Sequence, residues 1–138
     1  MTRNTGVKMF AGLVSDRIVR VINRTRNREL AARAAVADTF WTRLRGLLGR
    51  SGLGPGEGLV LTRTNSVHSL GMRFAIDVIH VDHAGRVCRL LTPLPPWRLG
   101  PIVRGGEYVI EVPAGVVAET GTGLGDDIEI VPQVASRD

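Results

Sequence analysis

The segment that most constrains this fold is residues 76–82, Ile-Asp-Val-Ile-His-Val-Asp, which is apolar on both alternations. Because successive side chains of a strand point to opposite faces, this pattern predicts a strand that is covered on both sides. The turn His83-Ala84-Gly85 predicts a tight hairpin into a second strand over residues 86–91. A chain of 138 residues is long enough to bury a core around this hairpin as one domain.

Further short strands are expected before and after this hairpin. Seventeen Gly and seven Pro residues favour many turns and short strands over a helical bundle. Apolar and β-branched runs predict strands at 18–22, 59–61, 66–69, 108–112 (with Glu111 directed outward) and 127–131. The Ala-rich segment 29–37 fits a returning strand, although its composition also permits a helix.

Two helices are predicted beside these strands. The main helix, near residues 39–49, has four apolar residues on one face: Phe40, Leu44, Leu47 and Leu48. A short helix is expected near residues 115–121. Together, the elements predict an α+β fold, a compact β-rich single domain with a mostly antiparallel sheet or a partly closed barrel.

The chain is expected to have a flexible N-terminal tail over residues 1–15, a globular domain over 16–132 and a C-terminal tail over 133–138. Within the domain, the prolines between residues 93 and 101 exclude regular structure, because each lacks an amide donor and restricts φ. A long irregular segment of this kind is typical of a lid, a binding loop or a wrapped sheet edge.

Charge is distributed unevenly along the chain. The formal net charge is +5, but residues 1–50 carry eleven Lys and Arg against three acids, and residues 51–138 carry seven against ten. This basic N-terminal third keeps nucleic acid open as a partner without favouring it. Aromatic residues make up 4% of the chain, too few for an extended stacking platform for single strands.

The single cysteine, Cys88, excludes an internal disulfide and fits a small buried apolar residue. The longest apolar stretch near the N-terminus is too short for a signal peptide or a membrane helix. A cytoplasmic protein with no membrane partner is therefore expected.

The stretch from His68 to Asp77 is the most unusual in the sequence. Asp77 lies in a strand predicted to be buried, and a buried carboxylate must be paired or hydrogen-bonded. Arg73, His68 or an arginine of the 39–49 helix would provide an ion pair, or the carboxylate would hold backbone amides of a loop. Alternatively, Asp77 binds a ligand with Arg73 as an anion clamp, or acts with His68 in acid–base chemistry.

Established catalytic and metal motifs are missing from the sequence. His68, His80, His83, Asp77 and Asp82 carry suitable ligand atoms, but no H-x-x-x-H or C-x-x-C spacing occurs. No G-x-S-x-G sequence presents a serine nucleophile, and the Gly-rich segment 51–58 lacks the spacing of a phosphate-binding loop. No catalytic residue, metal ligand or cofactor is therefore predicted.

Four segments in order resemble the domain of unknown function 192 family: 43–48, 68–78, 108–115 and the turn 121–126, within about residues 18–131. Ala75 departs from the proline that relatives commonly carry there. The resemblance implies a compact β-rich α+β domain and no particular activity. It suggests that six residues line a shared surface: Arg43, Gly46, His68, Met72, Arg73 and Asp77.

These features predict a non-catalytic ligand-binding or accessory module. Its concave site is expected between the 68–77 segment, the 39–49 helix and the Pro93–Pro101 loop, which carries Trp97. The partner would be a small molecule or a protein of unknown identity. Two alternatives remain open, a small hydrolase-like enzyme that uses His68 and Asp77, and a nucleic-acid accessory protein that uses the N-terminal arginines.

Overall fold

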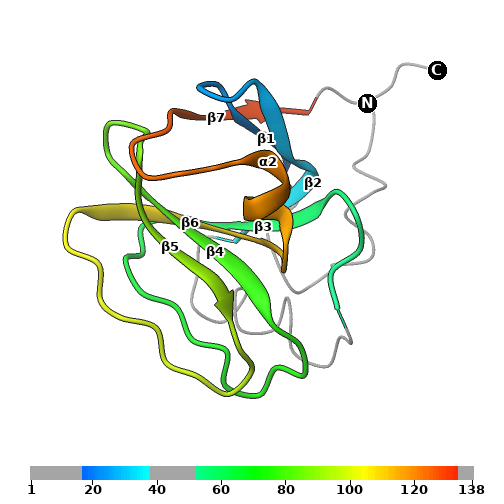
Figure 1. The fold of residues 1–138 in the computed structure, drawn as a ribbon, viewed down its shortest axis with the longest axis vertical. Helices are drawn as coiled ribbons and strands as arrows, with labels where there is room; N and C mark the ends of the chain where they lie inside the picture. The colour runs from blue at the N-terminus through cyan, green and yellow to red at the C-terminus, as the bar shows by residue number, and fades with distance from the viewer. Residues whose placement is uncertain (1–16, 38–51, 134–138) are drawn as a thin grey trace.

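The structure, a computed structural model, describes residues 17–37 and 52–133 and shows one sheet with a short helix packed against it (Figure 1). The strands are β1 (Ile18–Asn23), β2 (Arg28–Ala37), β3 (Glu57–Leu61), β4 (Ile76–Asp82), β5 (Val87–Leu94), β6 (Gly106–Pro113) and β7 (Ile128–Pro132). The helix is α2 (Val116–Thr120), within the range predicted for the shorter helix. The predicted 39–49 helix, with Arg43 and Gly46, and the tail residues 1–15 and 134–138 lie outside the described residues.

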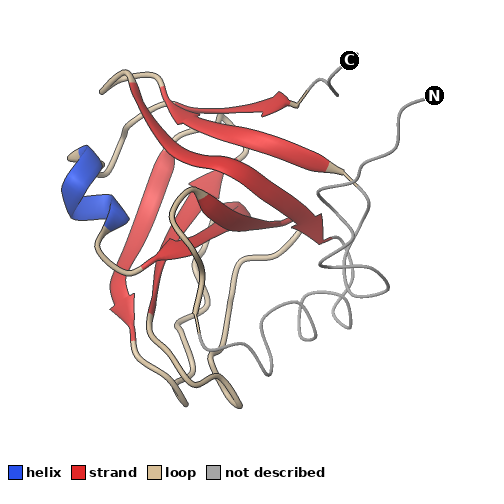
Figure 2. Ribbon diagram, turned by 90° about the vertical axis from the view of Figure 1, so that its right-hand side faces the viewer, coloured by secondary structure: helices blue, strands red, loops and turns tan. Residues whose placement is uncertain are grey.

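The sheet has seven strands in the order β5-β4-β6-β3-β2-β1-β7. Among the described strands β2 and β3 pair in parallel and the other neighbours pair antiparallel, which confirms a mostly antiparallel sheet. The sheet curls strongly but is not a closed barrel (Figure 2). Its two edge strands approach each other only near their ends, through an isolated bridge between Arg86 and Asp127.

The two faces of the sheet bury separate apolar clusters. The helix face is the side on which Val60, Ile79 and Ile110 pack with Val117 of α2. The loop face is the opposite side, where Leu59, Leu61, Ile76 and Val78 pack with Val67 and Met72 from the connection between β3 and β4. Every residue of β4 except Asp82 is buried, so the prediction of a strand covered on both sides is confirmed.

The central position of β6 in the sheet makes the prediction for Glu111 wrong. Glu111 was expected to point outward, but it is buried, because β6 lies between β3 and β4 and both of its faces are covered. A short run such as 108–112 shows alternation, but its place in the sheet depends on distant segments. The prediction for Glu111 is therefore wrong for a non-local reason.

Segment 29–37 is a strand held between β1 and β3, which confirms the predicted returning strand. Two differences concern strand limits. The predicted strand at 66–69 is reduced to an isolated bridge between His68 and Leu99. Strand β5 extends through Pro93 to Leu94, where irregular structure was predicted, and its place at the sheet edge makes a proline tolerable.

Gln133 falls in the predicted C-terminal tail but is held by the sheet. Its backbone N–H donates to the Ile18 carbonyl at 3.2 Å, and its side-chain amide donates to the Ala32 carbonyl at 2.9 Å. Gln133, the last residue that the structure describes, is therefore bonded to β1 and β2.

Candidate functional site

Asp77 positions the first turn of α2. The residue is 2% exposed, and its Oδ2 accepts hydrogen bonds from the backbone N–H groups of Gly115 and Val117, each at 3.0 Å. Gly115 enters the helix with a left-handed φ of 103°, a conformation that glycine adopts without steric cost. Of the structural roles considered for Asp77, the geometry shows the binding of backbone amides.

A pocket of about 410 Å³ lies beside Asp77. The described residues that line it come from β4, β5, α2 and the turns around α2: Asp77, Thr92, Pro93, Ala114, Gly115, Val117, Ala118, Gly121 and Thr122. His68, Met72, Arg73 and Trp97 are not among these lining residues. The residues predicted to share one site therefore divide between two regions.

Strand alternation explains this division. Ile76 and Val78 pack on the loop face together with Met72, so Asp77 between them points to the helix face. An acid–base pair of His68 and Asp77 would require both side chains on one side of the sheet. Among the described residues Asp77 is bound instead by the two amides of α2.

The other predicted residues lie in two loops on the loop face. Met72 is buried in the apolar cluster there, whereas Arg73 next to it is exposed. His68 is half-buried, and its Nδ1 accepts a hydrogen bond from the Leu70 N–H at 3.2 Å. His68 and Trp97 thus lie near each other along the joined loops, while Met72 acts as a core residue.

Ser69 joins these loops, a role that sequence reasoning missed. It is fully buried, its hydroxyl donates to the Pro95 carbonyl, and it accepts the Arg98 N–H at 2.9 Å. Its backbone N–H donates to the Arg98 carbonyl at 2.8 Å, and its carbonyl accepts the Trp97 N–H at 2.9 Å. No local pattern in the sequence marks this role, because the residues of the other loop that Ser69 binds lie 26 or more residues away.

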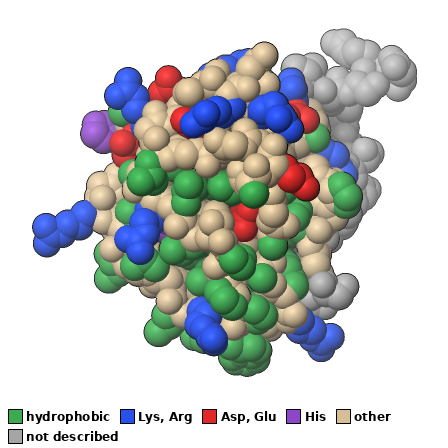
Figure 3. Space-filling model, in the orientation of Figure 1, with side chains coloured by type: hydrophobic (Ala, Val, Ile, Leu, Met, Phe, Trp, Pro, Cys, Tyr) green, Lys and Arg blue, Asp and Glu red, His purple; other side chains and the backbone are tan. Residues whose placement is uncertain are grey.

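The two loops present an apolar surface, here called the apolar platform and defined as Leu70, Trp97, Leu99 and Ile102. Their side chains are 40%, 64%, 74% and 77% exposed, respectively. The loops lie at the lower end of the molecule in Figure 1, and in Figure 3 that part of the surface carries hydrophobic and basic side chains. Large apolar side chains exposed on neighbouring loops make these loops a candidate interaction site.

The surroundings of the apolar platform are basic. Arg73, Arg98 and Arg104 lie on the same loops and are exposed. In the sequence no acid occurs between Glu57 and Asp77, or between Asp82 and Glu107. The two loops therefore favour negatively charged partners.

Trp97 combines exposure with an unfavourable backbone conformation. Its φ is 61°, in the left-handed region that bulky residues rarely adopt. The hydrogen bonds of Ser69 to the Trp97 and Arg98 amides hold this conformation. Such a conformation costs on the order of 1–3 kcal/mol, and it is concentrated at sites of function in proteins.

The turn after α2 is a second buried polar network. Oδ2 of Asp126 accepts hydrogen bonds from Asn23 Nδ2 at 2.9 Å, Gly123 N–H at 2.9 Å and Arg26 Nε at 3.0 Å. Burial raises the pKa of Asp126, but these hydrogen bonds outweigh it and hold the pKa below its ordinary value. Asp126 links the end of β1 to the segment before β7, which is a structural role.

The arginines of the described N-terminal region are partly neutralised. Arg20 pairs with Glu29 at 2.8 Å, Arg26 pairs with Asp126 at 3.0 Å, and Arg24 pairs with Glu129. The first pair joins β1 to β2, and the other two join the turn after β1 to β7 and to the segment before it. Part of the basic charge in this region is therefore used within the fold.

Two further titratable groups do not form a catalytic site. His80 is fully buried on the loop face, and neither of its ring nitrogens has a hydrogen bond within the part of the chain that the structure describes. Burial, with the nearby Arg89 charge, lowers its pKa to about 4. Burial, with the Asp82 carboxylate, raises the pKa of the Cys88 thiol, which disfavours the reactive thiolate.

Within residues 17–37 and 52–133, no group of three His, Cys, Asp or Glu residues could hold a metal ion. The same described residues include no helix with the length and apolar character needed to cross a membrane.

Comparison with known proteins identifies the family. The family model DUF192, described as Uncharacterized ACR, matches residues 21–130. The chain belongs to the DUF192 family. A UPF0127 protein of Pyrococcus furiosus is 36% identical over 115 residues, with 79% of this chain and 96% of the relative covered.

Two further comparisons agree with membership of DUF192. A UPF0127 protein of Thermococcus sibiricus is 34% identical over 113 residues, which cover 79% of this chain and 73% of the relative. The crystal structure of a protein of unknown function from Novosphingobium aromaticivorans DSM 12444 is similar, with a TM-score of 0.69 and 25% identity. That likeness covers 81% of this chain and 83% of the other. These three relatives therefore support the fold and the family, and their descriptions name no activity.

Proposed function

We propose that this DUF192 protein is a non-catalytic binding module whose apolar platform recognises an acidic and apolar segment of a partner protein. The observation that carries the proposal is Trp97, which is 64% exposed with a left-handed φ of 61°. Neither the exposure nor the conformation stabilises the fold. Ser69 nevertheless holds the residue in place, which is the arrangement expected of a preformed contact residue.

The chemistry of the platform supports a protein partner. Trp and Arg are the residues most enriched at the energetic centres of protein interfaces, and here Trp97 has Arg98 beside it. Arg73 and Arg104 extend the positive charge to the edges of the same loops. An acidic segment with apolar side chains would satisfy both the charge and the exposed apolar surface.

The two alternatives are less well supported. A single-stranded nucleic acid would stack its bases on several aromatic side chains, and Trp97 is the aromatic residue of the platform. A hydrolase would need His68 and Asp77 together, whereas Asp77 faces α2 and binds its amides. The hydrolase alternative therefore lacks support from the geometry of His68 and Asp77, and the nucleic-acid alternative would rest on N-terminal arginines of which Arg20, Arg24 and Arg26 are paired with acids.

The experiment is selection of a displayed random peptide library on the immobilised protein, followed by affinity measurement with synthetic peptides. We expect enriched peptides to combine Asp or Glu with apolar residues. Trp97→Asn should weaken their binding by at least about tenfold, because it removes the central apolar contact. Asparagine tolerates the left-handed backbone, so the loop is preserved.

Leu124→Asn is the matched control, because Leu124 is also exposed but lies in the turn after α2, away from the platform. It should leave peptide affinity unchanged. Enrichment of basic peptides, or equal binding by wild type and Trp97→Asn, would exclude the proposed function.

A further inference from the structure

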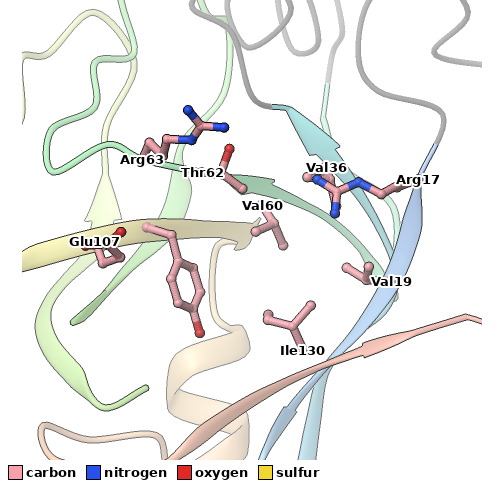
Figure 4. Close-up of a pocket in the computed structure, with 9 residues that line it drawn as sticks. Arg17, Val19, Val36, Val60, Thr62, Arg63, Glu107 and Ile130 are labelled. Carbon is pink, nitrogen blue, oxygen red and sulfur yellow. The ribbon is translucent and has the colours of Figure 1, made fainter. Parts of the chain in front are cut away.

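A pocket of about 250 Å³ lies on the helix face, between β1, β2, β3, β6 and β7. The described residues that line it are Arg17, Val19, Val36, Val60, Thr62, Arg63, Glu107, Tyr108 and Ile130. In Figure 4 the side chains of Val19, Val60 and Ile130 converge on a common space. The interior of this pocket is therefore apolar, and it is separate from the apolar platform.

The rim of the pocket is polar. Figure 4 shows the guanidinium groups of Arg17 and Arg63 on the same side of the cavity, with Thr62 between them. Arg63 is exposed and has a left-handed φ of 53°. Glu107 is also among the lining residues, so the described lining carries two positive side chains and one negative side chain.

Thr62 provides a second observation at this rim. Its Oγ1 is buried and has no hydrogen-bond partner in the part of the chain that the structure describes. A buried hydroxyl without a partner is unfavourable, and a bound acceptor would satisfy it. Tyr108 adds a neutral hydroxyl to the lining, since burial, with the Asp82 charge, raises its pKa to about 12.

The volume limits the size of a ligand. Each water molecule in the liquid occupies about 30 Å³, so the pocket has the volume of roughly eight waters. A ligand of about eight to ten non-hydrogen atoms fits this space. A chain of six to eight carbons with one small polar group has this size.

We infer that this pocket binds a small aliphatic carboxylate, with its chain against Val19, Val60 and Ile130 and its carboxylate at the rim between Arg63 and Thr62. The apolar interior accepts the chain by burial of its surface. The net positive rim favours a carboxylate over a neutral or cationic head group. This inference does not depend on the proposed function, because the apolar platform lies on the other face.

The test is isothermal titration calorimetry of the full chain with octanoate, octanol and octylammonium, each below the concentration at which it forms micelles. We expect saturable 1:1 binding of octanoate, weaker binding of octanol and the weakest binding of octylammonium. Arg63→Asn should weaken octanoate binding about two- to fivefold, the range for an exposed ion pair, and leave octanol binding unchanged.

Ile130→Trp should abolish binding by filling the pocket. Val131→Trp is its matched control, because the next residue of β7 points to the opposite face of the sheet. Trp97→Asn should leave octanoate binding unchanged, which separates this site from the platform. Failure of octanoate to saturate, retention of binding in Ile130→Trp, or tighter binding of octylammonium would overturn the inference.

Discussion

The α2 region and the apolar platform use polar residues in opposite ways. In the α2 region, Asp77 and Asp126 are buried and their carboxylates accept hydrogen bonds from α2 and from neighbouring strands. On the platform the buried polar residue is Ser69, and its hydrogen bonds hold exposed apolar side chains in place. The polar groups of the α2 region stabilise the fold, whereas Ser69 at the platform holds an exposed apolar surface in place.

This difference teaches how to read the motifs that resemble the family. Asp77 and Gly115 come from two separate motifs and meet at the start of α2. Asp126 closes the last motif by binding Asn23. These residues have structural roles. The proposed binding surface is therefore assigned to the loops around Ser69 and Trp97.

The largest expected effect is that of Asp77→Ala. It leaves the amides of Gly115 and Val117 without their acceptor, and should lower the free energy of unfolding by about 3–4 kcal/mol. Urea denaturation measures this loss. Asp77→Asn keeps an acceptor oxygen and should lose less. Equal stability of wild type and Asp77→Ala would show that Asp77 does not stabilise the α2 region, and the proposed contrast with the platform would fail.

The next effect is a pH dependence from His80, which is fully buried in β4. Its pKa is about 4 in the folded protein and 6.5 in the unfolded chain, so between these values the unfolded state binds the proton. Stability should therefore fall as the pH decreases from 6.5 to 4, by about 3 kcal/mol in total.

His80→Leu should abolish this dependence, because it removes the titrating group, and should not reduce stability at pH 7. Asp126, whose pKa is lowered, contributes stability that is present above its ordinary pKa of 3.8 and is lost as the pH falls below that value, outside this range. Denaturation curves at several pH values compare the two proteins. An unchanged slope in His80→Leu would show that another group is responsible.

Ser69→Ala should have an intermediate effect, on both the free energy of unfolding and peptide binding at the platform. Loss of the hydroxyl leaves the Arg98 amide and the Pro95 carbonyl without their partner, which costs about 2 kcal/mol. Peptide binding at the platform should weaken with it, because the Trp97 loop is no longer held. Preserved affinity with reduced stability would mean that Ser69 does not position the platform.

The smallest effect on stability is expected for Trp97→Asn. Its side chain is mostly exposed and asparagine tolerates the left-handed φ, so the free energy of unfolding should change by less than about 0.5 kcal/mol. Thermal denaturation measures it. A loss above 2 kcal/mol would show that Trp97 is a structural residue, and the platform would then resemble the α2 region.

Local patterns predicted much of the sheet. The two-sided apolar run at 76–82 is β4 with the same limits, and the turn before residue 86 leads directly into β5. The burial of Asp77 followed from its place in that run. The hydrogen-bond partners of Asp77 could not be predicted in this way, because Gly115 and Val117 lie 38 and 40 residues away.

The candidate site was predicted only in part. His68, Arg73 and Trp97 do lie on the joined loops, whereas Met72 is in the core and Asp77 is on the other face. Ser69 was missed, since a hydroxyl that links two loops has no local pattern. Leu70, Leu99 and Ile102 were missed as well, because exposure of an apolar side chain depends on what the rest of the chain covers.

The sequence by itself determined the family, the short strands, the hairpin and the need to satisfy a carboxylate in a buried strand, because these depend on residue type and spacing over a few positions. Only the tertiary structure decided which strands became central, which partners Asp77 received and which apolar residues stayed exposed. Those outcomes depend on contacts between segments that are distant along the chain. The burial of Glu111 and the exposure of Trp97 are the clearest examples.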